Sequence, residues 1–189
     1  MVNKIRFFQY ISLCVLGVLF LSFQVQAGVG LSQTRIIING DTNTASISAR
    51  NNNAQPYLVS NFITEKLDTS SPPLSGMFVV TPNIFRLAPE SENTIKIQII
   101  PTNLPKDRES LYYFHSRNIP STNKNEDGIK IAMENIIKVF YRPINLAINP
   151  KEAGDKLVVK ATPNGISIEN PTPYYINLFK ITVKNETIK

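Results

Sequence analysis

The sequence predicts an all-β protein, in which an immunoglobulin-like β-sandwich is followed by an incomplete second β-sandwich domain. Two observations carry this prediction. Short runs of alternating apolar and polar residues recur along the chain, and clusters of Pro, Gly and Asn that form turns separate them. No segment of useful length shows the periodicity of a helix. With 189 residues, the chain is long enough for one or two domains.

Seven runs have the strand pattern of a first, seven-stranded domain, which is the strand count of an immunoglobulin-like sandwich. They are residues 31–39, 44–50, 56–64, 77–82, 93–101, 110–120 and 128–146. Three further runs follow, at residues 156–161, 165–170 and 173–183.

The second group of strands is too short to close a sandwich of about 100 residues. We therefore expect a first domain over residues 28–145 and a partial, truncated second β domain over residues 146–189. Three strands alone bury little apolar surface, so the sequence leaves open whether this second part folds.

Residues 1–27 have the pattern of a secretory signal peptide. Lys4 and Arg6 precede an apolar stretch at residues 11–23, which small residues follow. An apolar stretch of about 13 residues is shorter than the roughly 20 that a transmembrane helix needs, so we favour a signal over a membrane anchor. The mature chain would begin at Gly28, in an export compartment and without membrane insertion after cleavage.

The cysteine and charge content exclude several classes of protein. Cys14 is the only cysteine and lies in the predicted signal, so the mature chain forms no disulfide and depends on its core. Without Lys4 and Arg6, the mature chain has 18 basic residues against 14 acidic ones. This excess is small and dispersed along the chain, so we expect no nucleic-acid partner.

The residues that could support catalysis are few. His115, the only histidine, lies in the middle of a predicted strand and far from any nucleophile elbow, so we interpret it as a sheet residue. Asp107 and Glu109 flank Arg108, and a structural ion pair explains them better than an acid–base pair. One histidine and no mature cysteine give no metal-ligand set. We expect no catalytic residues, no metal and no cofactor.

One predicted strand, at residues 128–146, is unusually long and apolar. Ile129, Ile131 and Met133 lie at alternate positions, and Lys138 and Arg142 follow toward the end of the run. Such a row of apolar side chains ordinarily belongs to a core. The periodicity alone does not explain the two cations.

Four segments in a fixed order resemble the periplasmic pilus chaperones of the chaperone–usher pathway. They are GVGLSQTRIII, FVVTPNIFRLAPESENTIKI, LPKDRESLYYFHSRNIP and IAMENIIKVFYRP. A fifth segment, IENPTPYYIN, resembles the start of the second domain in that family, so the resemblance covers nearly all of residues 28–175. It implies a non-enzymatic periplasmic chaperone whose partners are fimbrial (pilin) subunits and an outer-membrane usher.

The resemblance also implies roles for particular residues. A pilus subunit is a sandwich that lacks its last strand, and the chaperone fills the gap with its own strand, here through Ile129, Ile131 and Met133. Arg35 and Lys138 match the two cations that hold the C-terminal carboxylate of the subunit. Because Lys138 has the opposite parity to the three donor residues, either a bulge intervenes or the anchor cleft opens on the other face.

Three smaller features complete the resemblance. Glu109 and Arg142 match an interdomain ion pair; the acid that completes it would lie beyond Lys189, so we expect a more solvated pair. The Thr81-Pro82 segment departs from the Thr-Pro-Pro of the family, and the sequence leaves open whether its peptide bond is cis. The short loop at residues 121–128 resembles that of the subclass serving rod-type pili.

Two other interpretations remain open at this point. The chain could be a structural or adhesive pilin-like sandwich, although such proteins usually have a disulfide and an apolar N-terminal extension, and neither is present here. It could also be a truncated and inactive chaperone. The cognate subunit, the usher and the receptor of the pilus do not follow from the sequence.

Overall fold

The computed structural model describes residues 28–68, 71–100, 103–121, 129–163, 165–183 and 186–188. The predicted signal peptide, including Cys14, lies outside the described residues, and so does most of the predicted short loop. Within these ranges, no helix is long and apolar enough to cross a membrane.

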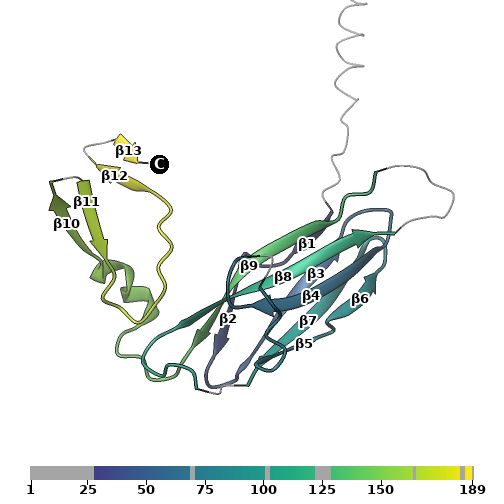
Figure 1. Ribbon diagram of the computed structural model, residues 1–189, viewed down its shortest axis with the longest axis horizontal. Coiled ribbons are helices and arrows are strands. Elements are labelled where there is room, and N and C mark those ends of the chain that lie inside the picture. The colour runs from purple at the N-terminus through teal and green to yellow at the C-terminus, as the bar shows by residue number, and fades with distance from the viewer. Residues whose placement is uncertain are drawn as a thin grey trace, which may run out of the picture.

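The first part of the chain forms two packed β-sheets (Figure 1). The four-stranded sheet has the order β1 (Val29–Leu31), β3 (Thr44–Asn51), β7 (Ser91–Ile99), β5 (Phe78–Thr81). The five-stranded sheet has the order β2 (Arg35–Asn39), β9 (Met133–Arg142), β8 (Ser110–Pro120), β4 (Tyr57–Thr64), β6 (Ile84–Leu87). Strands β2 and β9 run parallel, and the other paired strands run antiparallel. The predicted sandwich is therefore confirmed.

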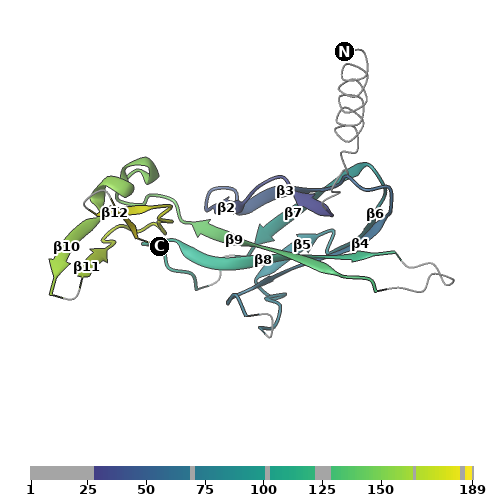
Figure 2. The same cartoon turned by 90° about the horizontal axis from the view of Figure 1, so that it is seen from above.

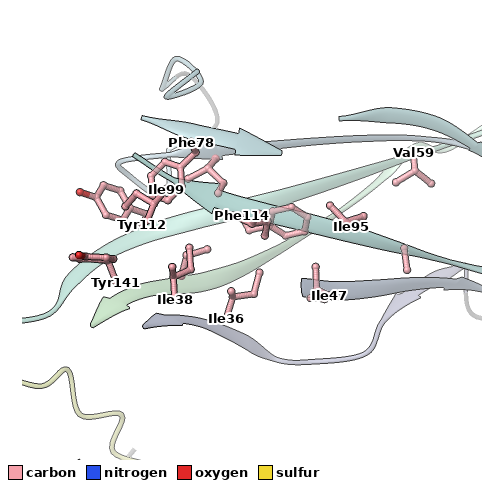
Figure 3. Packing of buried hydrophobic residues seen from close by; sticks show 14 of the residues in the cluster. Ile36, Ile38, Ile47, Val59, Phe78, Ile95, Ile99, Tyr112, Phe114 and Tyr141 are labelled. Carbon is pink, nitrogen blue, oxygen red and sulfur yellow. The ribbon is translucent and has the colours of Figure 1, made fainter. Parts of the chain in front are cut away.

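The core lies between the two sheets (Figure 3). It is built from the alternate, inward-facing residues of each strand, which is why the period-two pattern predicted the strands well. Ile36 and Ile38 of β2 and Phe114 of β8 are completely buried there. Each buried side chain of this size stabilises the fold by about 1.5–3 kcal/mol.

Three strands differ from the prediction. The expected strand at residues 31–39 is divided into β1 and β2, which belong to different sheets. Strand β6 was not expected, because four residues are too few to show a period; it follows the Thr81-Pro82 peptide bond, which is cis. The long strand at residues 128–146 is reduced to β9, because β8 pairs with it only from Met133 onward.

The second part of the chain consists of short elements (Figure 2). Two 3-10 turns, η1 (Pro150–Glu152) and η2 (Gly154–Lys156), precede the hairpin of β10 (Val158–Thr162) and β11 (Gly165–Glu169). A second hairpin joins β12 (Ile181–Val183) to β13 (Glu186–Ile188). The expected strand at residues 173–183 is formed only at its end, because residues 173–177 contact the first domain instead. The boundary between residues 145 and 146 stays a prediction.

Gly40 marks a close approach of the β2–β3 turn to the end of β9. Its N–H donates to the backbone oxygen of Arg142 at 2.7 Å. A Cβ at this position would lie 3.2 Å from that oxygen and from backbone atoms of Pro143 and Ile144.

Gly40→Ala is therefore expected to destabilise the protein by about 1–3 kcal/mol, because the backbone must shift to admit the methyl group. Urea unfolding followed by circular dichroism measures the effect. Gly30→Ala is the matched control, since a Cβ there meets no atom within 4 Å. Equal stability of the two variants would contradict the prediction.

Candidate functional site

Strand β9 has one edge that is only partly paired. Strand β8 covers its first edge from Met133 to Tyr141. On the second edge β2 pairs only with residues 138–142. Among the described residues, no strand pairs with the second edge of residues 133–137. An unpaired edge of this kind offers backbone N–H and C=O groups to another strand.

The three predicted donor residues lie at this edge and just before it. Met133 is the first residue of β9, and Ile131 and Ile129 precede it in a segment that belongs to no strand. Their exposed fractions are 60%, 72% and 94%, respectively. They are therefore not part of the core of this chain, which removes the simplest alternative for such an apolar row. A row of three large, exposed apolar side chains at alternate positions is unusual on a solvated surface.

The two predicted anchor cations lie side by side. Arg35 and Lys138 are register partners in the parallel pair of β2 and β9, at the point where this pairing begins. Both side chains are exposed, and they line a shallow pocket with Thr34, Ile136 and other neighbours. No acidic residue lines this pocket, and within the described part of the chain Arg35 has no ion-pair partner. The pocket is thus positively charged and uncompensated.

The pairing of β8 with β9 settles the question of parity. Residues pair one to one from Met133 to Tyr141, without a bulge. Val139 and Tyr141 face the core, so Lys138 lies on the outer face, which is the face of the five-stranded sheet directed away from the core. Met133 has the parity of the core-facing residues. Arg35 and Lys138 therefore lie on the face of the sheet opposite to the side chain of Met133.

Asn177 also lines the cation pocket, and the sequence analysis did not identify it. The ammonium group of Lys138 donates to Oδ1 of Asn177 at 2.6 Å. Asn177 belongs to the IENPTPYYIN segment, whose resemblance to a second-domain motif was the one signal that could have drawn attention to it.

The predicted interdomain ion pair is present and more buried than expected. Arg142 Nε donates to Oε1 of Glu109 at 2.7 Å, and the side chain of Glu109 is only 2% exposed. The backbone N–H of Tyr175 donates to the other oxygen of Glu109 at 2.8 Å. The guanidinium of Arg142 lies 5.2 Å from the ring centre of Tyr174. The expectation of a solvated pair was wrong, because backbone and aromatic groups of the second part shield it.

The residues considered for catalysis have structural roles. His115 is fully buried, with Nε2 2.9 Å from Thr64 Oγ1 and its ring stacked on Phe62 at 4.7 Å. Asp107 accepts from Arg108 at 2.7 Å, and this hydrogen bond lowers the pKa of the Asp107 carboxyl below its usual value. Glu109 is engaged elsewhere, so the two carboxylates do not form an acid–base pair. No cluster that could hold a metal occurs among the described residues.

Comparison with known proteins agrees with this architecture. Residues 28–147 match the family described as "Pili and flagellar-assembly chaperone, PapD N-terminal domain", and residues 152–189 match "Pili assembly chaperone PapD, C-terminal domain". The chain is 35% identical over 167 residues to the probable fimbrial chaperone protein ElfD of Escherichia coli O157:H7, which covers 87% of this chain and 70% of that protein. It is 34% identical over 164 residues to the chaperone protein PapD of Escherichia coli, covering 85% and 68%.

Solved structures give the same result. The Escherichia coli chaperone DraB is similar with a TM-score of 0.75 and 29% identity, covering 86% of this chain and 77% of that one. The complex of the SafA pilin with the SafB chaperone of Salmonella enterica contains a chain with a TM-score of 0.75 and 29% identity, covering 88% and 78%. The chain therefore belongs to the family of pilus assembly chaperones. This family is non-enzymatic, as the sequence analysis predicted.

Proposed function

We propose that this protein binds fimbrial subunits in the periplasm by donor-strand complementation and delivers them to an outer-membrane usher. The single observation that supports it best is the exposed row of Ile129, Ile131 and Met133 beside an unpaired strand edge. The SafB relative forms a complex with a pilin, and the SfaE relative is described as a periplasmic chaperone. The predicted signal peptide is consistent with export.

The donor residues act by burial, and no covalent step is involved. The backbone of β9 pairs with an edge strand of the subunit, while alternate side chains enter its open core. Each of Ile129, Ile131 and Met133 contributes about 1.5–3 kcal/mol when buried. The loss of translational and rotational freedom on association offsets part of this gain.

The cations fix the register of the pairing. Arg35 and Lys138 lie at one end of the open edge, where β2 begins to pair with β9. A subunit whose terminal carboxylate binds there must extend along residues 137–133 toward Ile129. Its last strand then runs parallel to β9, and every apolar side chain has a defined partner. A shift by one residue would turn those side chains to the wrong face.

Co-expression of this chain with a fimbrial subunit tests the proposal. We expect the subunit to accumulate in the periplasm only in the presence of the chain, and the two to purify together as a stable complex. The reason is that the unpaired edges of a free subunit aggregate or are degraded. Equal recovery of the soluble subunit with and without the chain would contradict the proposed function.

A further inference from the structure

Residues 173–177 are fastened to the first domain next to the cation pocket. The backbone N–H of Glu109 donates to the oxygen of Pro173 at 2.9 Å, and the N–H of Tyr175 donates back to the Glu109 carboxylate at 2.8 Å. The hydroxyl of Tyr174 donates to the oxygen of Ile148, which lies just after the first domain, at 2.6 Å. These contacts lie within four residues of Asn177, so they determine where its side chain reaches.

The contacts of this segment follow a simple register along β9. The ring of Tyr175 lies 5.7 Å from that of Phe140, and Asn177, two residues later, contacts Lys138, two residues earlier. In extended chains, residues two apart face the same side. Asn177 is thus placed against the outer face of the sheet by the packing of its neighbours.

We propose that Asn177 is a third member of the carboxylate anchor, which positions the ammonium group of Lys138 and donates to the bound carboxylate. This inference rests on the proposed function. An ammonium group has three N–H donors, so after the bond to Asn177 two remain for a ligand. Among the described residues, the Nδ2 amide group of Asn177 has no acceptor, and it lines the same pocket.

The chemistry of an amide suits this role. An Asp at position 177 would hold Lys138 equally close but would neutralise its charge and repel a carboxylate. The neutral amide orients the cation and keeps its charge available. The second part of the chain therefore contributes directly to recognition of the C-terminus of an extended polypeptide, in addition to the two cations of the first domain.

Binding of two peptides to the full-length chain tests this inference. The probe is a fluorescent peptide of alternating valine and serine with two N-terminal lysines, made once with a C-terminal carboxylate and once with a carboxamide. We expect the wild-type chain to prefer the carboxylate peptide. Asn177→Ala should weaken its binding about 10- to 150-fold, as expected for one lost hydrogen bond to a charged group. Asn177→Asp should weaken it more, and Asn177→Gln should retain much of it.

The comparison peptide and the control variant separate the outcomes. None of the Asn177 variants should weaken binding of the carboxamide peptide, and Asn52→Asp, which adds the same charge at an exposed site, should behave like the wild type. Thermal unfolding confirms that each variant is folded. If Asn177→Ala and Asn177→Asp leave the carboxylate preference unchanged, or weaken both peptides equally, the inference is overturned. If Lys138→Ala retains the preference, or the wild type shows none, the proposed anchor fails as well.

Discussion

Arg35→Ala and Lys138→Ala are each expected to abolish recovery of chaperone–subunit complexes. Both cations lie in one pocket that no acidic residue lines, so a bound carboxylate would receive charge-assisted hydrogen bonds from both. When a bound subunit covers the pocket, removing one partner of the buried, hydrogen-bonded charge pair costs about 2–5 kcal/mol. This corresponds to a loss of affinity of about 30- to several thousand-fold.

The fold should tolerate both substitutions. The side chains of Arg35 and Lys138 are exposed. The next residues in sequence, Ile36 and Val139, are buried and pack β2 and β9 against the core. We expect unchanged circular dichroism and thermal unfolding. Lys96→Ala is the matched control, because Lys96 is an exposed cation on β7 of the other sheet.

The measurement is co-purification of a co-expressed fimbrial subunit from the periplasm. Arg35→Lys is an informative third variant, because it keeps the positive charge but loses the planar guanidinium, which can bind a carboxylate through two parallel hydrogen bonds (bidentate binding). We expect it to recover little complex. Normal yield from the Arg35→Ala and Lys138→Ala variants would remove the anchor from the proposed function.

The sequence predicted the long, regular strands well, since their side chains alternate between core and solvent. Strand β8 has the predicted bounds, and β3 and β4 differ from the prediction by one residue at an end. The division of the first strand was not predictable in the same way. Polar residues separate Leu31 from Ile36, but no Gly, Pro or Asn marks a turn between them, and the packing of two sheets decides that β1 joins one sheet and β2 the other.

The candidate site was predictable where a periodic pattern or a motif defined it. The period of two predicted that Lys138 and Met133 lie on opposite faces of the sheet. The regular pairing of β8 with β9, which has no bulge, agrees with this. The contact with Asn177 could not follow from a pattern. It joins residues 39 positions apart, and it depends on how Glu109 fastens the second part of the chain.

Charged substitutions at the donor positions should have an effect of comparable size. We expect Ile131→Asp and Met133→Asp to abolish the accumulation of fimbrial subunits. Each variant loses the stabilisation that burial of the apolar side chain contributes, which is about 1.5–3 kcal/mol. In addition, a carboxylate must enter an apolar groove without a partner, which costs several kcal/mol more.

These variants also distinguish a donor segment from a structural one. Ile131 and Met133 are 72% and 60% exposed, so the stability of the free protein should change by less than about 0.5 kcal/mol. Val79→Asp is the matched control, because Val79 is an exposed apolar residue of the other sheet. If Ile131→Asp and Met133→Asp fold normally but no longer bind the subunit, the two side chains must be buried in the partner and not in their own domain. If subunits still accumulate with both variants, another segment makes the contact, and the open edge of β9 has a different role.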